Sequence, residues 1–134
     1  MRSIRKSKIG GGCAIYINKR LKASLISELT VNETFVETVF AQISLQNKNL
    51  IVGCCYRPPN SEIIPFQSFI ENKISSIASG SADIVLCGDF NLDMLKINVD
   101  SNAENFYQAM HSYSMLPFIS KPSRITDSYQ FFIN

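Results

Sequence analysis

The stretch NLIVGCCYRPPN (residues 49–60) and the stretch DIVLCGDFNLD (residues 83–93) decide the fold. Each begins as a compact run of β-branched and apolar residues and then changes to polar, turn-forming residues. Two prolines end the first run, because proline donates no hydrogen bond to a sheet, and a GDFN turn follows the second. We therefore predict buried strands at residues 49–56 and 83–87, with polar residues at their carboxyl ends, where α/β proteins usually build their sites.

Further elements extend outward from these two strands. Residues 34–45 alternate polar and apolar side chains and lead through QNKN into the strand at 49–56, which is typical of an antiparallel hairpin. Apolar residues recur at helical spacing in residues 65–79 and 102–113, so both segments are expected to be amphipathic helices. Extended segments are expected at residues 13–17, 116–119 and 125–133. This order of strands and helices predicts a mixed α/β layered fold.

Composition limits the class of protein. The 134 residues are 46% hydrophobic and 18% charged, which suffices for one domain with a real core. No apolar run approaches the roughly 18 residues of a membrane-spanning helix. The start, MRSIRKSKIGGG, has no apolar segment typical of a secretory signal. We therefore expect an intracellular protein, nuclear or cytoplasmic and not secreted, whose four cysteines are reduced and buried.

Charge is distributed unevenly along the chain. Seven lysines and arginines precede the first acidic residue, Glu28, whereas the remainder holds six basic residues against eleven acidic ones. A basic segment of this density suits the phosphates of a nucleic acid, and a solvated, flexible chain end explains it equally well. We divide the chain into a basic N-terminus at residues 1–9 and one domain at residues 10–134.

Two polar residues beyond the second strand could perform chemistry. Asp89 and Asn91 can face one pocket if strand-like alternation continues through Phe90. Hydrolysis of a phosphodiester suits this pair, because the carboxylate could orient or deprotonate a water while the carboxamide donates to the charge on the phosphoryl oxygens. Tyr56 and Arg57 could add donors to the same phosphate.

The same residues also have a purely structural interpretation. In many turns of this composition, Asp and Asn side chains bond their own backbone, and this is the commoner role when the turn is considered alone. Tyr56 can equally be a half-buried strand aromatic, and Arg57 a surface residue of a loop. A Ser/His/Asp triad is disfavoured because His111 is the only histidine. Both interpretations stay open at this point.

Six segments, taken in order and at their spacings, resemble a known family. The chain resembles the endonuclease/exonuclease/phosphatase superfamily and, within it, the endonuclease domain of non-LTR retrotransposons of the jockey type. The resemblance covers residues 10–128, and the joint occurrence of YRPPN and GDFNLD makes it specific. The segments are GGGCAIYINKRL, IVGCCYRPPN, FQSFIENKISSI, IVLCGDFNLDML, FYQAMHSYSMLPFI and KPSRITDS.

The resemblance implies a four-layer α-β-β-α sandwich and magnesium-dependent nicking of DNA, with a reverse transcriptase domain in the same polypeptide. By this resemblance Asp89 positions the water, Asn91 contacts the phosphate and Tyr56 lies beside the scissile group. Arg57 matches the arginine of the YRPP motif and is expected to bind substrate. Ser123 or Thr126, in PSRIT, would supply a hydroxyl near the DNA backbone.

The sequence also departs from the family pattern. In the family, a metal-binding glutamate lies upstream of the GGG segment, and Asp-His motifs lie downstream of PTRIT. Neither feature is present in this sequence. We therefore expect a sandwich that is incomplete at both ends, and we assign no residue as a metal ligand. Losing these groups predicts a chain with little or no activity. Two alternatives are a non-catalytic remnant that binds nucleic acid through residues 2–22, and a phosphatase for an inositol phosphate or a sphingolipid head group. YRPPN and PSRIT argue against the phosphatase.

Overall fold

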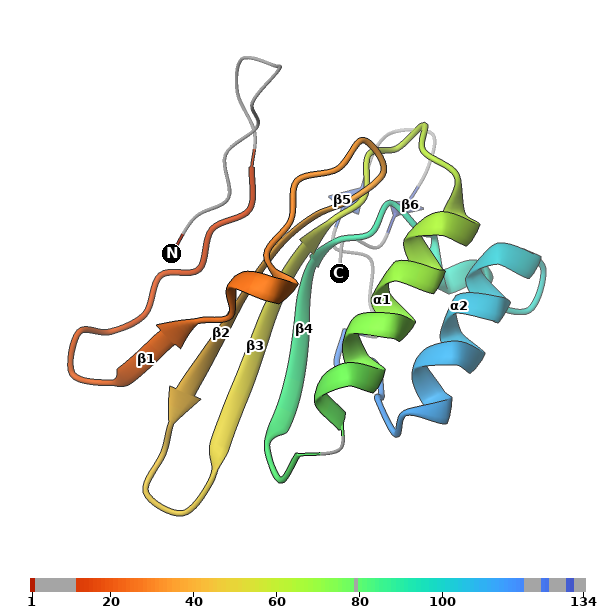
Figure 1. The fold of residues 1–134 in the computed structure, drawn as a ribbon. Coiled ribbons are helices and arrows are strands. Elements are labelled where there is room, and N and C mark those ends of the chain that lie inside the picture. The colour runs from red at the N-terminus through yellow and green to blue at the C-terminus, as the bar shows by residue number, and fades with distance from the viewer. Residues whose placement is uncertain (2–11, 79, 120–123, 126–129, 132–134) are drawn as a thin grey trace.

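The computed structural model describes residues 1, 12–78, 80–119, 124–125 and 130–131. Figure 1 shows the long helices lying beside the main sheet. The strands are β1 (Lys22–Leu25), β2 (Glu37–Ser44), β3 (Asn49–Tyr56), β4 (Asp83–Asp89), β5 (Arg124–Ile125) and β6 (Gln130–Phe131). The helices are α1 (Ile63–Ala78) and α2 (Ser101–Ser112), with 3-10 turns at Ser27–Leu29 and Met94–Lys96.

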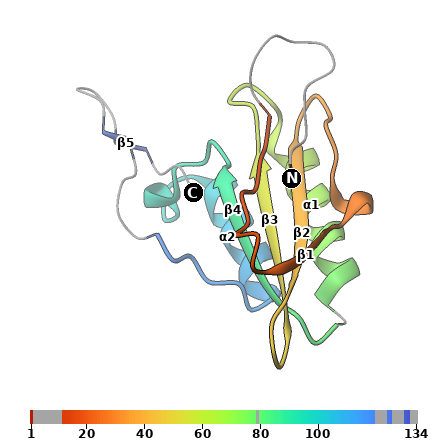
Figure 2. The same ribbon diagram turned by 90° about the vertical axis from the view of Figure 1, so that its left-hand side faces the viewer.

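The main sheet has the strand order β1-β2-β3-β4, and β5 pairs with β6 separately. β1 and β3 run antiparallel to β2, while β4 runs parallel to β3 and is reached through α1. Figures 1 and 2 show both helices on the same face of this sheet. The predicted mixed α/β class is therefore confirmed, and the main sheet with α1 and α2 forms two adjacent layers, one of strands and one of helices.

Element bounds follow the sequence pattern closely for the central strands. β3 has the predicted bounds, and the predicted hairpin pairs Ser44 with Asn49 across its turn. β4 extends two residues beyond the prediction because its pairing with β3 continues to Tyr56 and Asp89. Each helix begins one or two residues earlier than predicted.

The ends of the described chain differ more from the prediction. Residues 13–17 and 116–119 form no strand of the sheet, and the first strand is β1 instead. β1 alternates polar and apolar residues over only four positions, and most of its residues are exposed, so its strand signal is too short to identify an element from the sequence. Figure 2 shows the segment that follows Gly12 crossing the face of the sheet opposite the helices.

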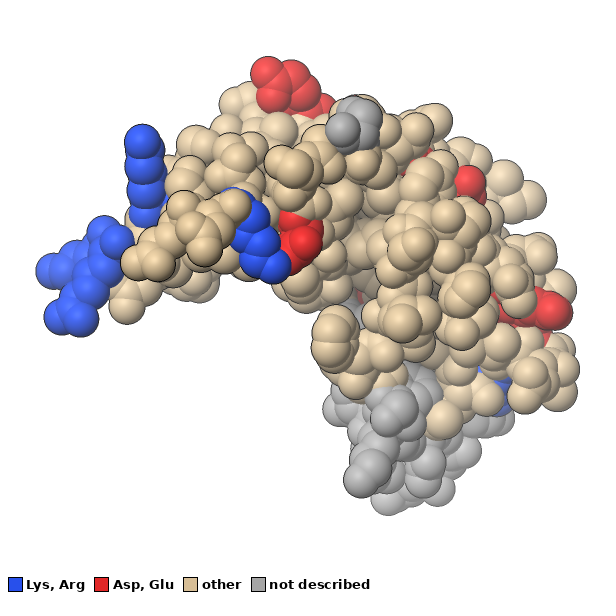
Figure 3. All heavy atoms as spheres, turned by 90° about the horizontal axis from the view of Figure 1, so that it is seen from below, with Lys and Arg blue, Asp and Glu red and all other residues tan. Residues whose placement is uncertain are grey.

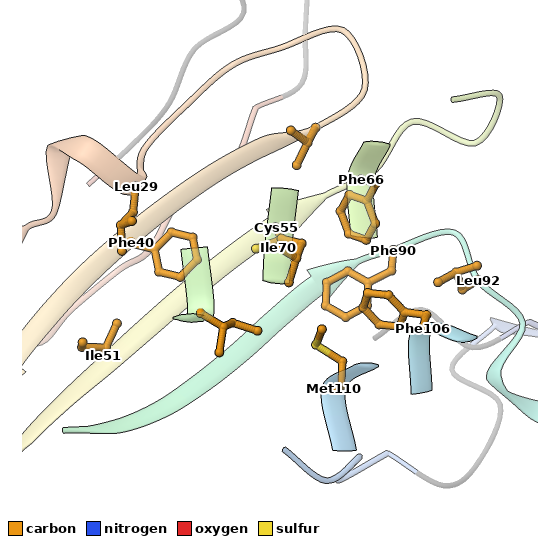
Figure 4. Close-up of a cluster of buried hydrophobic side chains, with 12 residues drawn as sticks. Leu29, Phe40, Ile51, Cys55, Phe66, Ile70, Phe90, Leu92, Phe106 and Met110 are labelled. Atoms are coloured by element: carbon orange, nitrogen blue, oxygen red, sulfur yellow. The ribbon is translucent and has the colours of Figure 1, made fainter. Parts of the chain in front are cut away.

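The core lies between the sheet and the helices (Figure 4). Phe66 of α1, Phe106 of α2 and Phe90 pack ring against ring, with centroids 5.5 to 5.8 Å apart. Phe66, Ile70 and Ile74 are the buried residues of α1, spaced four apart as a helix requires to present one apolar face. Phe90 thus joins the loop after β4 to both helices. No helix among the described residues is long and apolar enough to span a membrane.

Candidate functional site at the ends of β3 and β4

The carboxyl ends of β3 and β4 meet at one edge of the sheet. Tyr56 is paired with Asp89 in the parallel register, and the Arg57 amide N–H donates to the Asp89 carbonyl at 2.9 Å. Gly88 makes this close approach possible: its φ is +137°, and a Cβ there would stand 1.8 Å from the Cys55 carbonyl oxygen. The two polar loops predicted to carry the site are therefore neighbours.

Asp89 and Tyr56 lie at a cavity on the sheet face that the N-terminal segment crosses. The cavity has a volume of about 540 Å³, and Gly12, Cys13 and Ala14 form its other side. Both Asp89 and Tyr56 are half-buried. Asp89 Oδ1 accepts the Asn91 amide N–H at 3.0 Å, and Oδ2 has no hydrogen-bond partner within the described part of the chain. One carboxylate oxygen is thus fixed by the turn, and the other can meet a ligand.

Asn91 does not share the cavity of Asp89, so the expected single pocket is wrong. Its φ is +48°, in the left-handed region, and its side-chain Nδ2 donates to the Arg57 carbonyl at 2.7 Å. Phe90 still points to the helix side of the sheet, as strand alternation requires, and the alternation ends at the left-handed backbone of Asn91. Asn91 consequently lines a second cavity, of about 620 Å³, together with Arg57 and the first residues of α1. The turn interpretation therefore describes the hydrogen bond of the Asp89 side chain, whereas the Asn91 side chain bonds the backbone of the neighbouring loop after β3.

Arg57 is buried, with 5% of its surface exposed, which contradicts its interpretation as a surface residue of a loop. Its Nε donates to the Phe90 carbonyl at 2.7 Å, its Nη2 to the Asn91 carbonyl at 2.6 Å, and its Nη1 to the Ser61 carbonyl. Burial lowers the pKa of the guanidinium, and the Asp89 carboxylate opposes that change. In the structure, the Arg57 guanidinium thus donates its hydrogen bonds to backbone carbonyls. Its predicted contact with substrate stays a prediction.

Glu37 is a site neighbour that the sequence reasoning missed. It pairs with Tyr56 across β2 and β3, so Glu37, Tyr56 and Asp89 form one row across three strands. Its side chain is 3% exposed. The predicted hairpin, with strands ending at Leu45 and beginning at Asn49, would place Thr38 opposite Tyr56; the observed register pairs Ser44 with Asn49 and brings Glu37 there instead. Ser123 and Thr126 lie outside the described residues.

The described residues do not by themselves build a magnesium site. They contain no group of three or more His, Cys, Asp or Glu side chains that could hold a metal ion. Magnesium is usually bound through one or two carboxylates together with substrate oxygens and waters. Asp89 supplies one half-exposed carboxylate, and Glu37 is enclosed, so the donor set does not fit a resident magnesium ion.

No family model and no curated protein matches the sequence. Among solved structures, the chain is similar to one described as the endonuclease domain of TRAS1, a telomere-specific non-LTR retrotransposon, with a TM-score of 0.66 and 16% sequence identity. The chain has the fold of that endonuclease domain. The match covers 84% of this chain but 51% of the solved domain, so the chain spans about half the length of the structure it matches. The resemblance predicted from the motifs is confirmed for the fold.

Proposed function

We propose that the edge formed by β3 and β4 is part of a phosphodiesterase site that acts on DNA. The observation that carries this proposal is the Asp89 carboxylate, which faces a cavity beside Tyr56 while a turn amide fixes one of its oxygens. The shared endonuclease fold supports a nuclease over a small-molecule phosphatase, without deciding the substrate.

In this proposal, each side chain has a role that follows from its position. Asp89 Oδ2 accepts a proton from the attacking water or orients that water, because Oδ1 is engaged by Asn91. The Tyr56 hydroxyl donates to an oxygen of the scissile phosphate. Asn91 acts through the turn; for the predicted direct contact with the phosphate, its amide would first have to leave the Arg57 carbonyl. Ser123 or Thr126 contacts the DNA backbone.

The chain supplies only part of such a site. It spans about half of the solved domain, and its described residues lack a magnesium ligand set. We therefore expect the isolated chain to nick DNA slowly, if at all. Magnesium dependence, a DNA target and a reverse transcriptase domain in the parent polypeptide belong to the same proposal.

The test is nicking of supercoiled plasmid by the full chain with magnesium present. Asp89→Asn keeps an acceptor for the Asn91 amide but removes the carboxylate charge, so nicking should fall by about 10²-fold or more. Asp83→Asn is the matched control, because Asp83 lies at the opposite end of the same strand and is exposed. Measurable nicking by the wild type that is unchanged in Asp89→Asn would exclude this role for Asp89.

A second candidate is a protein that binds nucleic acid without cutting it. Figure 3 shows lysine and arginine side chains gathered at the β1 end of the molecule. Lys19, Arg20 and Lys22 are exposed there, and Lys22 pairs with Ser44, seven residues along β2 from the site row. DNA affinity that falls steeply with salt, with no nicking by any variant, would favour this function.

A further inference from the structure

We propose that Arg57 is a positioning residue, which fixes the Asp89 carboxylate by acting through Asn91. The proposal rests on the proposed function, because it gives a catalytic purpose to the orientation of Asp89. Three charge-assisted hydrogen bonds carry it, one buried and two partly buried, and all three end on backbone carbonyls of the two loops that flank the site. None of these three hydrogen bonds has a side-chain acceptor.

The bonds form a continuous path from Arg57 to the carboxylate. Arg57 Nη2 holds the Asn91 carbonyl at 2.6 Å, and Arg57 Nε holds the Phe90 carbonyl at 2.7 Å. Asn91 in turn donates its backbone N–H to Asp89 Oδ1 at 3.0 Å and its side-chain amide to the Arg57 carbonyl at 2.7 Å. Because Asn91 is held at both its carbonyl and its amide, its left-handed backbone has one orientation, and Asp89 Oδ1 is fixed by it.

The chemistry of this position requires arginine. A guanidinium presents five donors in a planar fork and can hold three carbonyls that lie in different directions. A lysine ammonium keeps the charge and an aliphatic stem, but its three donors radiate from a single nitrogen. Arg57 is also buried, with 5% of its surface exposed, so losing one of its hydrogen bonds has a cost in free energy. Arg57→Lys therefore keeps the positive charge at this position and removes the planar arrangement of donors, so it tests the two contributions separately.

The experiment measures amide hydrogen exchange by NMR in the full chain, comparing Arg57→Lys with the wild type. The Asn91 N–H should exchange at least tenfold faster in the variant, since its turn is no longer held. The Ile51 and Ile70 amides, in β3 and α1, should change much less, which a general loss of stability would not produce. Arg20→Lys is the matched control, because Arg20 is exposed, and it should leave all three amides unchanged.

Two outcomes would overturn the proposal. The first is an Asn91 amide that exchanges in Arg57→Lys as it does in the wild type. The second is exchange that increases equally at Asn91, Ile51 and Ile70, because this would mean that Arg57 serves global stability alone. If the variant does not fold, the wild type still decides: its Arg57 Nε–H must exchange at least tenfold more slowly than that of Arg20, and equal rates would refute the buried bonds.

Activity provides an independent readout of positioning. If the wild-type chain nicks DNA, Arg57→Lys should lower kcat by about tenfold or more while KM changes less than threefold, because the misplaced group is needed for the reaction and not for binding. A raised KM with unchanged kcat would instead assign Arg57 to substrate binding and overturn the proposal. The exchange measurement needs no nicking, so failure of the proposed function and failure of this inference remain distinguishable.

Discussion

Arg57 and Asn91 bind each other twice: Arg57 Nη2 donates to the Asn91 carbonyl at 2.6 Å, and Asn91 Nδ2 donates to the Arg57 carbonyl at 2.7 Å. This exchange joins the loop after β3 to the loop after β4. It also explains why the two candidate residues of the GDFN turn face different cavities, since the Asn91 amide is directed at Arg57. The turn therefore has a structural function and a candidate catalytic one at the same time.

The left-handed backbone of Asn91 leads to a prediction about two substitutions. Asn91→Gly and Asn91→Ala both lose the amide bond to Arg57, which contributes about 0.5–1.5 kcal/mol. In the folded state, alanine with a left-handed backbone is destabilised by about 1–2 kcal/mol relative to glycine. In the unfolded state, the greater conformational freedom of glycine lowers the stability of the glycine variant by about 0.4–1 kcal/mol, which offsets part of this difference. We expect Asn91→Ala to be less stable than Asn91→Gly by about 0.5–1 kcal/mol in urea unfolding.

Asn102 provides the opposite control, because it lies in the first turn of α2 and is exposed. Glycine is less favourable than alanine in a helix by about 1 kcal/mol, so the order of the two variants should reverse at this position. If alanine were the more stable variant at both positions, the strained backbone at Asn91 would be refuted.

Phe90 anchors the turn to the core, and its removal should be costly. Its ring is 7% exposed and contacts the rings of Phe66 and Phe106. Truncating a buried phenylalanine costs about 3–5 kcal/mol, a large share of the stability of a small domain. Phe90→Ala should therefore lower the free energy of unfolding by this amount, measured by denaturant titration. Phe118→Ala should change it by less than about 0.5 kcal/mol, since Phe118 is 96% exposed; equal losses in the two variants would contradict the packing described.

Much of this fold could be predicted from short-range patterns. The alternation in residues 34–45, the continuous apolar run of β3 and the four-residue spacing of Phe66, Ile70 and Ile74 each identify an element, because each is fixed by burial of one face or both. The apolar run of β4 also identifies its strand, but the predicted burial is wrong: the residues of β4 are exposed or half-buried. The N-terminal region could not be predicted in this way. β1 is mostly exposed and only four residues long, so its alternation is too short to identify a strand, and it forms by pairing with the edge of β2.

The geometry of the site could be predicted in part. Tyr56 and Asp89 were expected to face the same phosphate from the ends of two strands, and the structure pairs them in the parallel register of β3 and β4. The direction of Asn91 depends on one backbone angle, which the anchored Phe90 ring and the Arg57 fork determine together. Neither the hydrophobic periodicity nor the motif spacing of the sequence predicts the backbone angle of Asn91.

Gly88 is where the site depends most directly on the absence of a side chain. A Cβ at this position would stand 1.8 Å from the Cys55 carbonyl oxygen and 2.9 Å from the Cys55 nitrogen, in a backbone with φ of +137°. Gly88→Ala must therefore separate β3 from β4 beside Tyr56 and Asp89, and we expect a loss of about 3 kcal/mol or more. Gly80→Ala is the matched control, because its Cβ would approach the Ile77 carbonyl oxygen only to 3.4 Å. Thermal unfolding of both variants checks this: Gly88→Ala should melt well below the wild type and Gly80→Ala close to it, whereas similar melting temperatures for the two would contradict the close approach of β3 and β4.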